Sequence, residues 1–112
     1  MVEYTLDERP ALIIVRLRGS LDAYLRDFSP EVEKQIRANP RHLVVDLSGI
    51  DFIGSRGMGL LFHLHKVLSD VGRELYLAAL SQAVTDALEV GGIASLLKIC
   101  ATEDEAVSAA SS

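Results

Sequence analysis

Residues 43–68 read LVVDLSGIDFIGSRGMGLLFHLHKVL, and this stretch decides the fold. It opens on a short apolar run, Leu43 to Leu47, which is typical of a strand covered on both faces. It closes on a segment whose leucines and valines recur every three or four residues, as on the buried face of a helix. The glycine-rich turn from Gly54 to Gly59 lies between them, so the stretch predicts a strand, a loop and a helix in direct succession.

The flanking segments predict the same alternation of strands and helices. The expected strands cover residues 2–6, 11–17, 43–47, 75–80 and 96–100. The expected helices cover residues 30–39, the stretch from the turn at 54–57 to about 71, a segment that Ser81 caps and that Gly91 and Gly92 end, and residues 104–110. The first two strands form a hairpin, and residues 22–28 form a turn or loop. The fold class is therefore α/β, a mixed, mostly parallel sheet of four to five strands with helices packed on it.

Composition limits the class of protein. The chain has 112 residues, 49% of them apolar and 24% charged, proportions typical of one folded domain spanning residues 1–112. Its net charge of −5 gives no general attraction to nucleic acids or anionic membranes, so neither is expected as a partner. No apolar run reaches the roughly 18 residues that span a bilayer, and the acidic start has no signal-peptide character. The single Cys100 excludes an intrachain disulfide, and this favours the reducing cytoplasm as the compartment. Cys100 itself is expected to be a small buried apolar residue.

The glycine-rich turn does not fit two familiar catalytic motifs. A nucleophile elbow requires G-x-S-x-G, and Ile53 stands where the first glycine belongs. A dinucleotide-binding loop requires G-x-G-x-x-G, whereas this turn has the reversed spacing and no following Walker lysine. A serine hydrolase and a nucleotide-binding loop are therefore both disfavoured.

Ser55 has two interpretations, because it stands at the expected start of a helix. In the first, its hydroxyl only caps the helix by accepting a hydrogen bond from an N–H of the first turn. In the second, Ser55 is a phosphorylation switch, because unpaired N–H groups and the helix dipole favour negative charge at this position. A phosphate would add roughly two negative charges there, and the neighbouring Arg56 would accommodate them.

The motifs resemble those of the STAS domain of bacterial anti-sigma-factor antagonists. The resemblance covers residues 43–68, the segment GSLD before them and ELYLAALSQAVTDALEVGGI after them, which is nearly the whole chain. In that family an acidic strand end is followed by D-S-[ST]-G-[LM]-G and a helix. Ser55, Gly57, Met58 and Gly59 match this pattern, and Asp22 matches the acidic residue of the family's G-x-L-D.

The resemblance implies a regulatory function for the chain. The unphosphorylated domain of the family binds an anti-sigma factor and releases sigma, and phosphorylation by a partner anti-sigma kinase breaks that complex. The serine that carries the phosphate corresponds to Ser55. The expected function is therefore that of an anti-sigma-factor antagonist, a binding protein and not an enzyme, whose partner is an anti-sigma factor or serine kinase of that class. A monomer is the expected oligomeric state.

Two residues depart from the family's motif. Gly54 stands where the family has Asp, and Arg56 stands where it has Ser or Thr. Together they make the loop two charges more positive than the usual pattern. They favour an alternative of the same fold, a constitutive adaptor such as a stressosome-like or lipid-transport component that is never phosphorylated.

The helix after the turn carries a core face and a candidate partner surface. At 100° per residue the core face contains Leu60, Leu61, Leu64, Val67, Leu68 and Val71. Met58, Phe62, His65 and Ser69 are expected on the opposite side, beside the candidate switch. An exposed Phe and Met are more than a solvated face requires, so they predict an interface. The expected partner-binding residues are Asp22, Arg56, Gly57, Met58, Phe62 and His65.

No catalytic site, metal site or cofactor is expected. His63 and His65 diverge on a helix, and no nucleophile, base and orienting group converge in the sequence. Asp22, Asp46 and Asp51 are candidates to converge at the carboxyl ends of the parallel strands, where ligands of α/β proteins bind. Their competing interpretation as caps and turn residues is the favoured one.

Overall fold

The computed structural model describes residues 2–22 and 29–111. The strands are β1 (Val2–Glu8), β2 (Leu12–Leu21), β3 (His42–Ile53), β4 (Leu75–Ala78) and β5 (Lys98–Cys100). The helices are α1 (Ser29–Ala38), α2 (Ser55–Asp70), α3 (Gln82–Val90) and α4 (Glu103–Ser111), with a short 3₁₀ turn, η1 (Ala94–Leu96). The predicted loop at 22–28 lies outside the described residues except for Asp22.

The strands form one sheet in the order β1-β2-β3-β4-β5, so β3 is central as predicted. The hairpin pair β1 and β2 is antiparallel, and every later pair is parallel. The dense β-branched run in β2 and the apolar start of β3 suit strands that are buried on both faces. The predicted fold class, a mixed and mostly parallel sheet, is confirmed.

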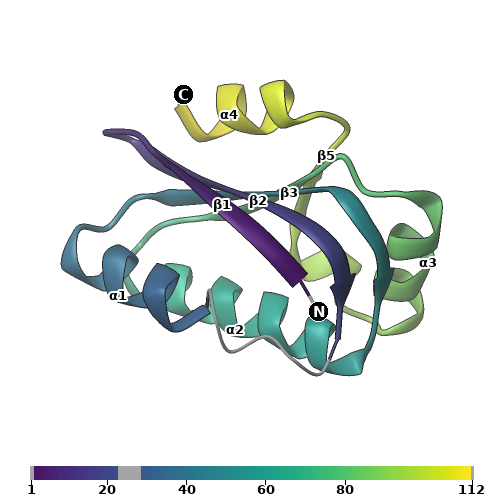
Figure 1. Ribbon diagram of the computed structural model, residues 1–112. Helices are drawn as coiled ribbons and strands as arrows, with labels where there is room; N and C mark the ends of the chain where they lie inside the picture. Colours follow the sequence, from purple (N-terminus) through teal and green to yellow (C-terminus); the bar gives the residue numbers. More distant parts are fainter. Residues whose placement is uncertain (1, 23–28, 112) are drawn as a thin grey trace.

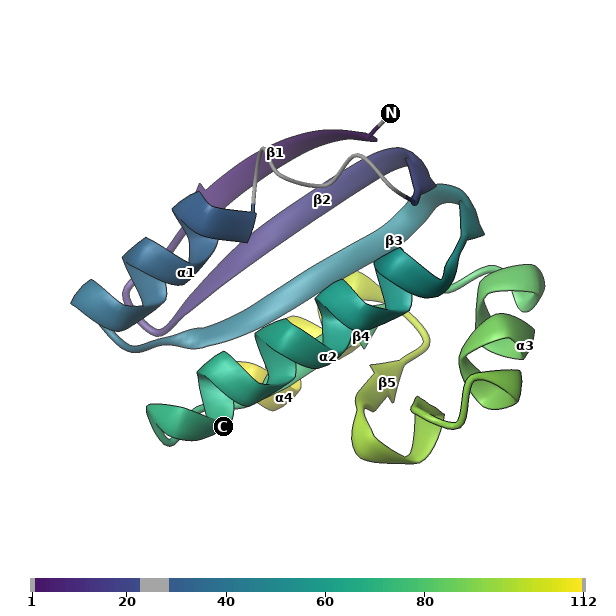
Figure 2. The ribbon, with the colours of Figure 1, turned by 90° about the horizontal axis from the view of Figure 1, so that it is seen from below.

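The sheet separates two apolar layers (Figure 1). Helices α1, α2 and α3 share the larger core, to which they contribute Val32, Leu64, Val84 and Leu88 among others. Helix α4 covers the opposite face with small side chains, Ala106 and Ala110, which pack on β2, β3 and β4. Figure 2 shows α2 running along the sheet, with its first turn directly after the end of β3.

Strand β3 is longer than predicted, because it continues beyond Leu47 to Ile53. Two irregularities in the β2 register keep the strands paired as far as Leu21 and Ile53. Gly49 belongs to this extension: a Cβ there would lie 2.7 Å from the carbonyl oxygen of Leu17. The extension therefore brings the end of β3 beside the end of β2, which places the Gly54 turn next to Asp22.

Two other predictions differ in extent. The last strand is confined to residues 98–100, because residues 94–96 form the η1 turn before it. Cys100 is half-buried beside the α4 layer and not fully buried as predicted. Burial raises the pKa of its thiol above the ordinary value.

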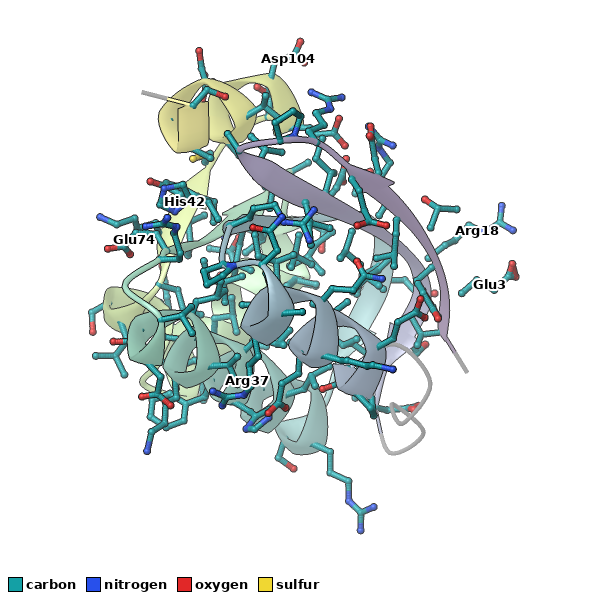
Figure 3. The ribbon with its side chains drawn as sticks, turned by 90° about the vertical axis from the view of Figure 1, so that its left-hand side faces the viewer. Glu3, Arg18, Arg37, His42, Glu74 and Asp104 are labelled. Carbon is teal, nitrogen blue, oxygen red and sulfur yellow. The ribbon has the colours of Figure 1, made fainter. Side chains whose placement is uncertain are left out.

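His42 makes the stability of the fold rise with pH. Its Nδ1 accepts a hydrogen bond from the backbone N–H of Glu74 at 3.1 Å, and Figure 3 shows the two residues side by side. Burial, together with the nearby charge of Arg73, lowers the pKa of His42 below its ordinary value. The unfolded chain therefore binds the proton more readily, so this group's contribution to stability is complete above about pH 6.5 and is lost as the pH falls.

We expect His42→Asn to flatten the rise of stability with pH between about pH 5 and pH 7. The Asn side-chain oxygen can still accept the hydrogen bond from Glu74, so folding at neutral pH is retained. Urea unfolding midpoints across this pH range check the result. An equally steep rise in wild type and His42→Asn would show that another group is responsible.

Candidate functional site: the start of helix α2

Ser55 is the first helical residue of α2, and Gly54 is the capping residue before it. The Gly54 backbone is extended, its N–H donates to the carbonyl oxygen of Leu21 at 2.9 Å, and its own carbonyl accepts from the Met58 N–H at 3.0 Å. The interpretation of Ser55 as the helix cap is therefore wrong. Gly54 has no side chain with which to cap the helix, and Ser55 is exposed.

Gly57 fixes the position of the helix start. A Cβ at this residue would lie 2.3 Å from the carbonyl oxygen of Leu21 and 2.9 Å from the Ile53 side chain. Gly57 is buried, so its part in the site is to let the first turn of α2 approach the end of β2. Of the predicted partner-binding residues, Gly57 is the buried one, and it holds in place the exposed first turn of α2.

Of the three aspartates considered as candidates to converge, only Asp22 and Asp51 lie near the ends of their strands. Asp22 follows the end of β2 and lies against the turn, since its Cβ is 4.0 Å from the Cβ position of Gly54. Its Oδ1 is buried and accepts no hydrogen bond from the part of the chain that the structure describes. Asp51, near the end of β3, accepts a hydrogen bond from the Ser20 hydroxyl at 3.0 Å.

Asp46 is elsewhere, because it lies in the middle of β3 opposite Arg16 of β2 and Ala78 of β4. Its Oδ1 accepts the backbone N–H of Ser48 at 2.8 Å. Burial alone would raise the pKa of Asp46, but the hydrogen bonds from Ser48, a further one with Glu103 and the charge of Arg16 together hold that pKa below the ordinary value. Asp46 therefore does not join Asp22 and Asp51, and its local hydrogen bond with Ser48 fits the favoured interpretation of a structural residue.

The exposed face of α2 has an aromatic centre. Phe62 is 37% exposed, its ring centroid is 6.2 Å from that of His65, and the Lys66 ammonium lies 5.8 Å from the Phe62 ring centroid. These side chains line a shallow surface cavity together with Ser69, Asp70 and Leu96. The predicted exposure of Phe62 beside the core stripe is confirmed.

Met58 was expected on the exposed side of α2, opposite the core, but it is partly covered. It is half-buried and packs against the large core, and its Sδ would lie 2.5 Å from a Cβ on Gly91 at the end of α3. A single helical wheel cannot show that α3 covers this flank of α2. Met58 therefore presents only part of its side chain to a partner.

Phe52 is the residue that sequence reasoning missed. It is 55% exposed, and its ring lies 3.4 Å from the Cβ position of Gly54. The adjacent Ile53 is buried, and neighbouring side chains of a strand point to opposite faces, so Phe52 points outward at the end of β3. Phe52 and Phe62 thus provide two exposed aromatic rings in the strand and helix that flank Ser55.

Across residues 2–22 and 29–111, no three metal-ligating side chains gather in one place. Within the same ranges, no helix has the length and apolarity that crossing a bilayer requires.

Comparison with known proteins gives relatives over the whole chain. A sequence model of the STAS domain matches residues 3–106. The Bordetella bronchiseptica protein BtrV is 27% identical over 109 residues, which make up 96% of this chain and 94% of BtrV. The anti-sigma F factor antagonist of Paenibacillus polymyxa is 24% identical over 108 residues, 95% of this chain and 92% of that protein.

Solved structures share the fold. The anti-sigma factor antagonist SpoIIAA in its unphosphorylated form superposes with a TM-score of 0.76 at 20% identity, covering 95% of this chain and 96% of SpoIIAA. Bacillus SpoIIAA in its phosphorylated form gives a TM-score of 0.74 at 21% identity, covering 95% and 97%. The arrangement of five strands and four helices is therefore a known one.

Proposed function

Because the chain belongs to the STAS domain family, we propose that it is an anti-sigma-factor antagonist whose binding of an anti-sigma factor is switched by phosphorylation of Ser55. The relatives named anti-sigma factor antagonists support the binding function. In this proposal the chain is a regulatory protein of the cytoplasm, its partner is an anti-sigma factor with serine kinase activity, and none of its residues is catalytic.

The position of Ser55 carries the proposal. Its side chain is exposed at the first residue of a long helix, so a kinase can reach it without unfolding the domain. Asp22 lies against the same turn, and its Oδ1 accepts no hydrogen bond within residues 2–22 and 29–111. A partner that covers this turn would meet a hydroxyl, a carboxylate and the exposed aromatic rings of Phe52 and Phe62.

A phosphate on Ser55 would affect folding and binding in opposite ways. For folding, the unpaired N–H groups of the first turn and the guanidinium of Arg56 favour the added charge. For binding, an interface that buries Phe62 and part of Met58 would have to desolvate roughly two extra negative charges. The same modification therefore leaves the domain folded and weakens the complex.

We expect Ser55→Asp and Ser55→Glu to fold normally and to bind the anti-sigma factor at least about 10-fold more weakly than wild type, which corresponds to about 1.4 kcal/mol. Ser55→Ala should bind like wild type and resist the kinase. Arg56→Ser should make the Ser55→Asp defect larger, because Arg56 screens the added charge. Isothermal titration calorimetry checks these affinities, with Ser95→Asp on η1 as the control for a negative charge elsewhere on the surface.

Phe62→Ala is expected to weaken the same complex by more than about 1 kcal/mol while changing stability by less than about 0.5 kcal/mol. The reason is that large, partly exposed aromatic side chains act as anchors in interfaces, and Phe62 is 37% exposed beside the switch. Calorimetric titration and urea unfolding measure the two effects. Val90→Ala, at the exposed end of α3, is the matched control. A Phe62→Ala protein that unfolds would place the ring in the core.

A constitutive adaptor of the same fold is the second candidate, and Gly54 and Arg56 favour it. Incubation with ATP and candidate serine kinases, followed by intact-mass measurement, separates the two. Addition of one phosphate to wild type and none to Ser55→Ala supports the switch. The variant Gly54→Asp restores the family's residue, and its Cβ would make only ordinary contacts with Phe52 and Asp22. Phosphorylation of Gly54→Asp but not of wild type would favour the adaptor.

A further inference from the structure

Strand β5 is one edge of the sheet, and among the described residues no further strand pairs with Ile99 on its outer side. The carbonyl oxygen of Cys100 accepts the Ala79 N–H at 3.2 Å, so Cys100 turns its backbone groups toward β4. In a strand the N–H and C=O of successive residues point alternately to either side. The N–H and C=O of Ile99 therefore point away from the sheet, where another strand can pair with them.

Two apolar side chains are exposed at the same edge of the sheet. Ile99 is 41% exposed, and Leu96, just before β5, is 49% exposed. Charged side chains, Lys in particular, commonly protect an exposed edge strand from pairing, and β5 contains Lys98, so a strand that pairs with β5 must offer this ammonium an opposite charge. The edge thus combines free backbone groups with apolar side chains that a neighbour would cover.

We propose that β5 pairs with β5 of a second copy of this chain, antiparallel about a two-fold axis through Ile99, so that the two sheets become continuous. The contact is isologous, because the same residues occur on both sides. The two Ile99 residues exchange both of their outward hydrogen bonds, and their side chains meet on the face of the sheet that α2 covers.

The two-fold register also pairs opposite charges. With Ile99 on the axis, Lys98 of one copy stands opposite Cys100 of the other, as a non-hydrogen-bonded pair with Cα atoms about 4.5 Å apart. Glu105 lies next to Cys100 within each copy, since its Oε2 accepts the Ala101 N–H at 3.1 Å. Each Lys98 ammonium can therefore reach Glu105 of the second copy, and the interface contains this ion pair twice. This charge complementarity is what selects a second copy as the occupant.

A contact built on three residues of each strand is small, so the dimer is a weak one. Disulfide trapping detects weak pairing. In Lys98→Cys, which loses the Lys98–Glu105 ion pairs but keeps the hydrogen bonds between the two Ile99 residues, the new thiol faces Cys100 of the second copy at a separation suited to a disulfide. In wild type the two Cys100 residues are only diagonal neighbours, about 7–8 Å apart, which is too far for an unstrained bond.

We expect Lys98→Cys, oxidised mildly in air, to form at least about 10-fold more disulfide-linked dimer than the control Lys34→Cys on α1, because pairing raises the effective thiol concentration. Adding Ile99→Glu should suppress the cross-link, since it places like charges directly opposite each other on the axis. Non-reducing gels measure the product, and circular dichroism confirms that Ile99→Glu is folded.

Sedimentation equilibrium of wild type provides a second readout that needs no variant. The average mass is expected to rise with protein concentration and to fall back when salt screens the Lys98–Glu105 pairs. Cross-linking of Lys98→Cys no faster than Lys34→Cys, cross-linking unaffected by a folded Ile99→Glu, or a constant monomer mass would each overturn the proposal.

Discussion

Leu64→Ala is expected to lower the free energy of unfolding by about 2–5 kcal/mol. Leu64 is 1% exposed at the centre of the buried stripe of α2, where it contributes to the core shared with β3 and β4. Truncation removes the transfer free energy of the buried side chain and leaves a cavity that the packed sheet cannot close. Urea unfolding of the two proteins measures the difference.

The matched control is the same substitution at an exposed leucine. Leu96 is 49% exposed on η1, so Leu96→Ala should change the unfolding free energy by less than about 0.5 kcal/mol. A urea midpoint that hardly moves for Leu64→Ala would contradict the assigned phase of α2.

Gly57→Ala is the second substitution with a large expected effect, a loss of about 1–3 kcal/mol or more of stability. The added Cβ would lie 2.3 Å from the carbonyl oxygen of Leu21, so either the helix start or the end of β2 must move. Because Ser55 is held by the same turn, we also expect weaker binding to the anti-sigma factor. Thermal unfolding and calorimetric titration measure the two consequences.

Gly59 supplies the control for this prediction, because it lies in the same helix and a Cβ there would have nothing within 4 Å. Gly59→Ala should therefore stabilise the domain by about 0.5–1 kcal/mol through helix propensity and a less flexible unfolded chain. Equal effects of Gly57→Ala and Gly59→Ala would show that the close approach to Leu21 is not required.

The order of strands and helices is predictable because periodicity and capping are local properties. The apolar run at residues 43–47 and the leucine spacing of α2 each identify an element without any knowledge of its neighbours. The cap at Ser81 shows the same, since its hydroxyl accepts the Val84 N–H at 3.2 Å as the sequence suggests. Gly91 and Gly92 end α3 where the sequence places its stop.

The features that sequence reasoning missed depend on contacts between distant segments. The extension of β3 to Ile53 rests on its irregular pairing with β2. The position of Gly54 as the cap follows from its hydrogen bond to Leu21, and the partial burial of Met58 follows from the end of α3. None of these leaves a periodic signal in the chain. The exposed position of Phe52 follows from the β3 extension and was missed for the same reason.

The central claim is that the charge state of Ser55 controls partner binding while the fold is kept. The most direct measurement is calorimetric titration of one anti-sigma factor with the unphosphorylated protein and with the same protein phosphorylated on Ser55, both shown to be folded. The account predicts that the phosphorylated protein binds at least about 10-fold more weakly. Equal affinity of the two forms would contradict the switch and leave the constitutive adaptor.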